Sequence, residues 1–215
     1  MYKLSKNIEV SITVIRRLPK YYRYLSDLLD KGTTRISSQE LSILTGFTAS
    51  QIRQDLNNFG GFGQQGYGYN VEDLQKELGR ILGLDFKYNA IVVGAGNLGQ
   101  AIANYKGFED AGFKVLSLFD RNPRIFGLKI RNIEIRDMEI IEEFIKEHNV
   151  EIGIITTPKE SAQEVADIYI KAGIKGIWNF APTDLTIPDN VIIENVRLNE
   201  SLFILSYFLK TLHQD

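Results

Sequence analysis

Apolar residues recur with two different spacings, which divide the chain into a helical first third and a longer part where strands alternate with helices. Before residue 60, apolar positions three or four residues apart predict helices over 5–17 and 21–29 and two shorter helices that begin after Ser37 and Thr48. Aromatic and glycine residues over 59–69 then predict a β-hairpin, which a further helix over 71–82 follows.

From residue 90 onward, short apolar and often β-branched runs predict strands at 90–93, 115–119, 151–156, 176–179 and 191–193. Helical patterns lie between most of them, over 97–110, from 140 to about 148 and from 158 to about 172. This alternation is typical of a doubly wound, mostly parallel α/β sheet. We therefore expect an N-terminal domain over 1–84, a Rossmann-like domain over 85–196 and a C-terminal helix within 197–215.

The first of these strands runs into a Gly-x-Gly-x-x-Gly turn and then directly into a helix. In a dinucleotide-binding unit the first glycine makes the turn, the second lets the backbone approach a pyrophosphate, and the third lets the helix pack on the strand. Taken alone the motif is weak, because a tight turn without a ligand can look the same. The predicted cofactor-binding residues here are Gly94, Ala95, Gly96, Asn97, Leu98 and Gly99.

An acidic residue at the end of the second strand strengthens the dinucleotide interpretation. Asp120 lies 21 residues after Gly99, where a carboxylate can accept the ribose hydroxyls and repels a 2′-phosphate, so NAD(H) is favoured over NADP(H). Arg121 and Arg124 weaken that preference, because an Arg can hold the phosphate. Loops at the same edge of the sheet contribute the other predicted cofactor-binding residues. These are Arg121, Thr156, Thr157, Pro158, Asn179, Phe180, Ala181 and Pro182.

Two capping boxes, Ser37-x-x-Glu40 and Thr48-x-x-Gln51, start helices on either side of a turn that contains Gly46. This spacing is typical of a helix-turn-helix, and the polar side of its second helix suits the reading of base edges in a major groove. An ordinary helical hairpin with one solvated face is the alternative. The predicted DNA-contacting residues on this helix are Thr48, Ser50, Gln51, Arg53, Gln54 and Asn57.

The hairpin over 59–69 would be a wing beside this recognition helix, with Gln64, Gln65 and Tyr67 placed to contact a neighbouring minor groove. These Gln residues offer hydrogen bonds without the charge that usually drives such insertion. A flexible interdomain linker is the alternative for this glycine-rich stretch.

Apolar residues cover much of the circumference of the predicted helix over 198–212, so it needs burial on more than one side. We expect it to pack against a second subunit, with or without exchange between protomers, and burial in its own domain is the alternative. A two-fold dimer would also let the helix-turn-helix read a palindromic site.

Charge differs between the two parts of the chain. Residues 1–70 contain nine basic and five acidic residues, whereas the remainder contains sixteen basic and twenty-two acidic ones, which permits a polyanionic partner for the first module. Cysteine is absent, which fits a reducing cytoplasm, and no His, Asp and Glu spacing suggests a metal. No apolar run approaches the ~20 residues of a membrane span.

A dehydrogenase needs a group that exchanges a proton beside the nicotinamide. His148 stands at the end of a predicted helix, where the helix dipole accounts for it, and His213 is in the tail. We therefore expect a protein that binds NADH and NAD⁺ as a sensor and is not an enzyme. The alternative is a small NAD-dependent oxidoreductase whose N-terminal helices bind another protein.

Taken together, these segments resemble the Rex family of bacterial redox-sensing transcriptional repressors over essentially the whole chain. The segments that carry the resemblance are Arg17-Leu18-Pro19 with Tyr21-Tyr22-Arg23, Gln51 to Leu56, Phe59-Gly60 with Gly66 to Asn70, Gly94 to Gly99, Tyr105 to Phe108, Phe119-Asp120, Asn179 to Pro182 and Glu194 to Val196. The resemblance implies a homodimer of winged-helix and Rossmann domains that binds operator DNA and releases it when NADH binds. Our hypothesis is that NADH lies over Gly94 to Gly99 with its nicotinamide near Tyr105, Thr157 and Asn179 to Pro182.

This chain departs from the family pattern at two places. Gln54 and the wing residues Gln64 and Gln65 stand where basic residues are common, which leaves Arg16, Arg17 and Arg53 as the expected cationic DNA contacts.

The second departure is Arg197, which occupies the position of an Asp that pairs across the dimer with the residue matching Arg23 in better-known members. Because two Arg residues repel each other, an acid such as Glu194 or Glu200 would have to substitute in that version of the switch.

Overall fold

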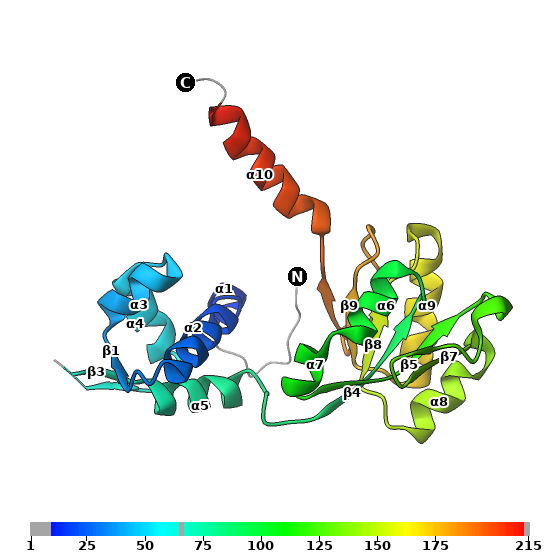
Figure 1. Ribbon diagram of the computed structural model, residues 1–215, viewed down its shortest axis with the longest axis horizontal. Helices are drawn as coiled ribbons and strands as arrows, with labels where there is room; N and C mark the ends of the chain where they lie inside the picture. The colour runs from blue at the N-terminus through cyan, green and yellow to red at the C-terminus, as the bar shows by residue number, and fades with distance from the viewer. Residues whose placement is uncertain (1–9, 65–66, 213–215) are drawn as a thin grey trace. The chain divides into compact units, whose positions relative to one another are not determined.

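Two units make up the chain, Met1–Phe86 and Lys87–Asp215, and each has its own hydrophobic core (Figure 1). The computed structural model describes residues 10–64 and 67–212. Predicted positions 5–9, Gln65 and His213 therefore lie outside the described residues. Within the described ranges, no helix is long and apolar enough to cross a membrane.

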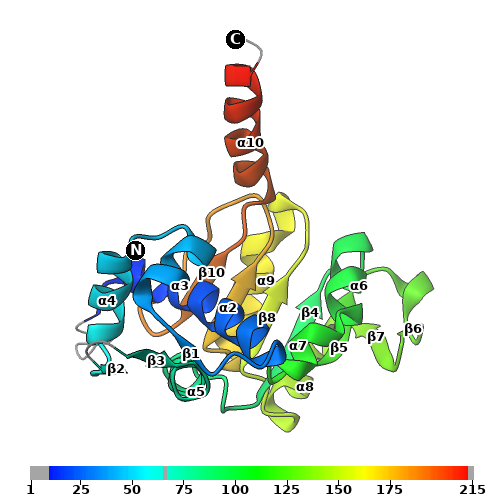
Figure 2. The same ribbon diagram turned by 60° about the vertical axis from the view of Figure 1, so that its left-hand side comes forward.

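The N-terminal unit combines a helix-turn-helix with a small antiparallel sheet, and α2, α3 and α4 lie side by side in it (Figure 2). Strand β3 lies between β1 and β2, so the glycine-rich stretch forms the predicted hairpin and is not a linker. This arrangement confirms the predicted winged helix. The elements are α1 (Ile12–Ile15), α2 (Leu18–Asp30), β1 (Arg35–Ile36), α3 (Ser38–Thr45), α4 (Ala49–Asn57), β2 (Gly63–Gln64), β3 (Gly68–Asn70) and α5 (Val71–Ile81).

Local chemistry fixes the ends of α3 and α4. The Ser37 hydroxyl accepts the backbone N–H of Glu40, whose carboxylate accepts the backbone N–H of Ser37, as the capping box predicts. These bonds to the ionised form lower the pKa of Glu40. Helix α3 ends at Gly46 with a left-handed φ of 75°, and the Thr48 hydroxyl accepts the N–H of Gln51 at the start of α4.

A buried ionic cluster holds α4 against α2. The carboxylate of Asp55 accepts hydrogen bonds from Nε and Nη2 of Arg17, both at 2.6 Å, and from the hydroxyl of Tyr21 at 2.7 Å. Asp55 is only 2% exposed. The bond to Asp55 raises the pKa of Arg17, and burial raises the pKa of Tyr21. The orientation of α4 in this unit is therefore set by a paired charge as well as by apolar packing.

The C-terminal unit is built on a seven-stranded sheet with the order β10-β9-β8-β4-β5-β7-β6, parallel except for the edge strand β6. Its strands are β4 (Tyr88–Val93), β5 (Phe113–Asp120), β6 (Lys129–Ile130), β7 (Ile133–Asp137), β8 (Ile152–Ile155), β9 (Gly176–Asn179) and β10 (Ile192–Asn195). Its helices are α6 (Asn97–Asn104), α7 (Lys106–Asp110), α8 (Ile141–Glu147), α9 (Lys159–Ala172) and α10 (Leu198–Leu212), with short 3₁₀ turns at Pro123–Ile125 and Met138–Ile140.

Side chains of β4 alternate between two cores on the two faces of this sheet. Ile91 and Val93 pack with α8 and α9, whereas Ala90 and Val92 pack with α6. The chain runs outward from β4 to β5 and β7 and then returns to β8 on the other side of β4. The order therefore reverses between β4 and β8, which is where doubly wound sheets bind ligands.

One feature of this unit was predicted wrongly from the sequence, and another was missed. The predicted helix over 97–110 is wrong in its middle, because Tyr105 has an extended backbone (φ −79°, ψ 108°) that separates α6 from α7. Its ring folds over Gly107, where a Cβ would come within 2.6 Å of it. The hairpin of β6 and β7 was not predicted, although the alternation of Ile133 and Ile135 is a strand signal.

Helix α10 confirms the predicted C-terminal helix, and none of its described residues is buried. Its large apolar side chains are between 47% and 72% exposed. Burial of this helix within its own domain, the alternative interpretation, does not occur in the described part of the chain. These side chains are Leu198, Leu202, Phe203, Ile204, Leu205, Tyr207, Phe208, Leu209 and Leu212.

We predict that Asp55→Ala destabilises the N-terminal unit by about 3–5 kcal/mol, because it leaves the Arg17 guanidinium in a partly buried site without its counter-ion. Amide hydrogen exchange of α2 and α4 in the full chain measures this loss. Asp27→Ala, which removes an exposed carboxylate from α2, is the matched control and should leave exchange unchanged. Equal protection in both variants would contradict the structural role of the cluster.

Candidate functional site

The glycine turn sits where the strand order reverses, and two of its glycines are sterically required. Gly94 has a φ of 101°, and a Cβ there would come within 2.9 Å of the carbonyl oxygen of Thr156. A Cβ at Gly99 would overlap the carbonyl oxygen of Gly94. In contrast, a Cβ at Gly96 would meet nothing within 4 Å. Open space therefore lies beside Gly96, as a cradle for a close-approaching ligand requires.

Helix α6 begins at this open space without a side-chain cap. Gly96 is its N-cap residue, so the first N–H groups of the helix and the positive end of its dipole face the turn. A phosphate group is the natural partner for such an arrangement. The geometry fits the pyrophosphate of a dinucleotide at the predicted residues Gly96, Asn97 and Leu98, all of which are exposed.

Asp120 connects the end of β5 to the glycine turn. One carboxylate oxygen accepts the backbone N–H of Ala95 at 2.8 Å, and the other accepts that of Asn122 at 2.9 Å. Each oxygen has a second lone pair, so the carboxylate can still accept a ribose hydroxyl. Arg121 bonds instead with Glu164 of α9 at 2.5 Å, and this exposed ion pair raises the pKa of Arg121.

The two threonines after β8 differ in what their hydroxyls do. Thr156 donates to the carbonyl oxygens of Val93 and Gly94, at 3.0 and 2.8 Å, and so fastens the glycine turn to the neighbouring strand. The hydroxyl of Thr156 thus positions the glycine turn, and its role as a cofactor ligand stays a prediction. The hydroxyl oxygen of Thr157 is buried without a partner, so a ligand at this edge would satisfy it. Pro158 is exposed and precedes α9.

Asn179 was predicted to face the cofactor, but the structure buries its side chain completely. Its amide nitrogen donates to the carbonyl oxygen of Thr183 at 3.0 Å and to Oδ1 of Asn195 at 2.8 Å, and its amide oxygen accepts the N–H of Ala181 at 2.9 Å. Its side chain therefore supports the loop after β9 from within, and its contact with the cofactor stays a prediction. In this loop Ala181 is buried, Phe180 is half-buried and Pro182 is exposed.

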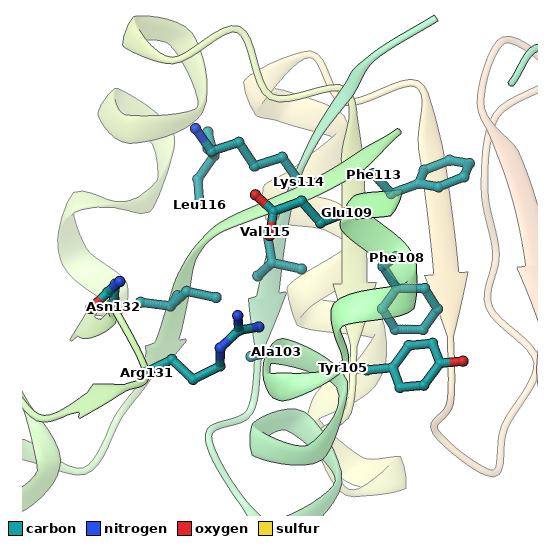
Figure 3. A pocket seen from close by; sticks show the side chains of 11 residues that line it. Ala103, Tyr105, Phe108, Glu109, Phe113, Lys114, Val115, Leu116, Arg131 and Asn132 are labelled. Carbon is teal, nitrogen blue, oxygen red and sulfur yellow. The ribbon is translucent and has the colours of Figure 1, made fainter. Parts of the chain in front are cut away.

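Tyr105 lies at the opposite end of α6 from the glycine turn, about 12 Å along an eight-residue helix. It packs edge-on against Phe108 and lines a groove of about 400 Å³, toward which Arg131 extends (Figure 3). The structure thus places Tyr105 away from the glycine turn, while ring contacts through Phe108 and Trp178 connect it with Phe180 of the loop after β9. The remaining residues of the groove are Ala103, Glu109, Phe113, Lys114, Val115, Leu116, Asn132 and Ile133.

A second groove, of about 380 Å³, is almost entirely apolar and runs across the open face of the sheet. Trp178, Ile152 and Ile192 contribute to it, and burial raises the pKa of Glu194 at its margin. Neither groove contains a residue of the glycine turn. The dinucleotide edge is thus distinct from both grooves, and the apolar groove is an exposed apolar surface of this chain.

The polar residues expected to contact DNA lie on one side of α4. Ile52 and Leu56 point into the core, whereas Ser50, Gln51, Arg53, Gln54 and Asn57 are exposed. Arg53 also donates to the hydroxyl of Ser38 on α3 at 2.8 Å. This bond positions its guanidinium beside the exposed face, as a base-reading side chain requires.

Four other predicted DNA contacts have different surroundings. Arg17 forms a structural ion pair with Asp55, and its DNA contact stays a prediction. Arg16 is exposed, as is Thr48. In the wing, Tyr67 is 71% exposed.

Gln64 belongs to β2, and Gln65 lies outside the described residues. Sequence reasoning missed Arg35, whose guanidinium donates to the carbonyl oxygen of Tyr67 at 3.4 Å and lies over its ring. The pairing of β1 with β3 brings these two residues together, and the sequence alone gave no sign of it.

No group of three or more potential metal ligands occurs within residues 10–64 and 67–212. His148 caps the end of α8, where its ring nitrogen Nδ1 lies 3.0 Å from the carbonyl oxygen of Phe144 and its ring stacks on that of Phe144. This histidine is part of helix packing, as predicted, and does not serve the dinucleotide edge.

Comparison with known proteins assigns both units. The family model described as "CoA binding domain" matches residues 85–183, and that described as "Putative DNA-binding protein N-terminus" matches residues 9–57. The redox-sensing transcriptional repressor Rex of Clostridioides difficile (strain 630) is 65% identical over 95% of this chain and 97% of its own. The protein of the same name from Thermoanaerobacter pseudethanolicus is 61% identical over 96% and 92%.

Solved structures of a repressor called RSP superpose on this chain. The complex with β-NAD⁺ and operator DNA has a TM-score of 0.90 and 60% identity, covering 95% of this chain and 94% of that one. The complex with β-NADH has a TM-score of 0.90 and 57% identity, covering 96% and 97%.

We predict that Gly96→Ala lowers the affinity for NADH at least tenfold and leaves the melting temperature of the protein unchanged. The added methyl group meets no protein atom but occupies the space of the pyrophosphate. Isothermal titration calorimetry and thermal unfolding measure the two quantities. Gly99→Ala should instead lower both, because its methyl group pushes α6 away from the turn. Unchanged NADH affinity in Gly96→Ala would show that the dinucleotide lies elsewhere.

We also predict that Arg53→Ala weakens binding to operator DNA roughly tenfold or more, which is the loss expected for one good contact to a base edge. Arg80→Ala, which removes an exposed cation paired with Glu77 on α5, is the control and should bind normally. Fluorescence anisotropy with operator and with unrelated duplex DNA separates base reading from general charge. An equal loss on both DNAs would mean that Arg53 contacts phosphate only.

Proposed function

The chain belongs to the Rex family of redox-sensing transcriptional repressors, and on this basis we propose that it binds palindromic operator DNA as a homodimer and releases it when NADH binds. The observation that carries the proposal is the presence in one chain of an open glycine turn and an exposed, polar recognition helix. Relatives with the same fold have been crystallised with NAD⁺ and operator DNA and with NADH.

In this proposal the cofactor lies along the carboxyl edge of the sheet. The start of α6 binds the pyrophosphate, Asp120 binds the adenosine ribose, and Thr157 donates its hydroxyl to the cofactor. The loop with Phe180 and Pro182 contacts the nicotinamide end. The bound group supplies a redox-dependent charge, because the nicotinamide ring is positive in NAD⁺ and neutral in NADH. The chain's own residues bind and orient it, and none is assigned a proton transfer.

Two apolar surfaces support the homodimer. The large side chains of α10 are all exposed, and the apolar groove across β4, β5, β8, β9 and β10 is uncovered. Exposed apolar areas of this kind mark interaction surfaces. A second copy of the chain covers both by packing α10 and the sheet faces of two protomers against each other, which also pairs two recognition helices for a palindrome.

Release of DNA by NADH requires that NADH bind one arrangement of the dimer more tightly than the other. The arrangement with less affinity for NADH is then the one whose recognition helices match the half-site spacing. Because linkage is reciprocal, operator DNA must weaken NADH binding by the same factor.

Such a repressor of bacterial genes acts in the cytoplasm, where its operator is. The relatives named above are transcriptional repressors, and we assign no dehydrogenase activity to this chain.

We predict that NADH titrated into a complex with palindromic operator DNA lowers DNA affinity at least tenfold, whereas NAD⁺ at the same occupancy does not. Fluorescence anisotropy of labelled DNA gives the DNA affinity, and the absorbance of NADH shows whether it is consumed. Undiminished DNA affinity at saturating NADH would contradict the proposal. Asp120→Ala should require more NADH for the same release, because a ribose contact is lost.

A further inference from the structure

Arg197 lies in the two-residue link between β10 and α10, and its side chain turns back to the loop after β9. Its guanidinium donates to the carbonyl oxygen of Ala181 at 2.6 Å and to that of Thr183 at 2.9 Å. It also bonds to the carboxylate of Asp184 at 2.5 Å. The Arg197 side chain is 21% exposed, whereas that of Asp184 is 95% exposed. The carbonyl bonds are therefore the better-shielded part of this contact.

The same loop is held from its other side by Asn179. The carbonyl oxygen of Thr183 accepts from both the Asn179 amide and the Arg197 guanidinium. The Asn179 amide also bonds to Asn195, and the backbone N–H of Val196 donates to the carbonyl oxygen of Asn179. The loop after β9 and the segment that precedes α10 are thus joined by one continuous set of hydrogen bonds. A displacement of Thr183 changes the position of Arg197 directly.

The planar guanidinium suits this connection better than another cation would. It presents several N–H donors in a fixed fork, so two carbonyl oxygens and one carboxylate can be bound together. A Lys ammonium at this position cannot span the same acceptors with fixed geometry. Helix α10 has no buried residue in the described part of the chain, so its position relative to the sheet is not set by packing within the protomer.

We propose that Arg197 is the positioning residue that transmits cofactor binding from the loop after β9 to α10 and thereby to the arrangement of the two subunits. This inference rests on the proposed function. It gives a role to the residue that replaces the acid expected at this position, and it requires no pairing of Arg197 with another Arg across the dimer. The coupling runs through the carbonyl oxygens of Ala181 and Thr183, and the exposed Asp184 contributes little.

The test measures the coupling factor, which is the ratio of operator affinities without and with saturating NADH. We expect Arg197→Gln and Arg197→Lys to reduce this factor about tenfold, while NADH affinity in the absence of DNA changes less than about threefold. Asp184→Asn, which keeps both carbonyl bonds, should retain the factor within about twofold. Lys171→Gln, which removes an exposed ion pair between α9 and Glu142 of α8, is the control and should match the wild type.

NADH affinity is read by energy transfer from Trp178, the sole tryptophan, and the dimer is verified by sedimentation. Full coupling in Arg197→Lys with loss in Asp184→Asn would overturn the inference in favour of a simple charge effect. Unchanged coupling in both Arg197 variants would also overturn it. Loss of NADH binding or of the dimer in these variants would make Arg197 a binding or assembly residue instead. Absence of coupling in the wild type would refute the proposed function itself.

Discussion

The close contact between α6 and the end of β4 is the constraint on which the C-terminal unit depends. No side chain fits at Gly99, because the carbonyl oxygen of Gly94 occupies that space. This contact brings the start of α6 to the point where the strand order reverses, and Thr156 and Asp120 secure the turn from the strands on either side. The helix dipole, the free N–H groups and the open space at Gly96 are then aimed at one place. A phosphate site results from packing, before any ligand contact is considered.

In the N-terminal unit, a buried cluster of charged and polar side chains holds the functional helix in place. The recognition helix must present polar residues to solvent while one turn of it stays buried, and the Arg17–Asp55–Tyr21 cluster holds that turn at a fixed angle. Arg53 gains a second support from Ser38 on the preceding helix. Both units therefore expose their working groups on rigid elements and keep the supporting hydrogen bonds behind them. On the proposed homodimer, precision of this kind would let a small change of subunit angle alter DNA affinity.

Much of this architecture could be predicted from the sequence because it depends on local patterns. Capping boxes, glycine spacing and apolar periodicity located the winged helix, the strands β4, β5, β8 and β9, and α10. The hydrogen-bond partners of individual polar side chains could not be predicted. Three side chains illustrate this, those of Asn179, Thr156 and Arg17. Each could hydrogen-bond to a bound ligand or DNA, but each forms hydrogen bonds within the protein, and only the folded backbone decides this. The break at Tyr105 likewise depends on where its ring packs, which no helical periodicity records.

The exposed α10 has a consequence for the cell. On the proposed homodimer, α10 would gain its burial only from another copy of the chain, so the stability of the protein would follow mass action. At low copy number, unpaired chains would carry a long apolar helix that proteases and chaperones recognise, and they would be removed before they reach DNA. On the proposed homodimer, the dissociation constant of the dimer would set the lowest abundance at which the protein binds DNA, so that expression level would act beside the redox state.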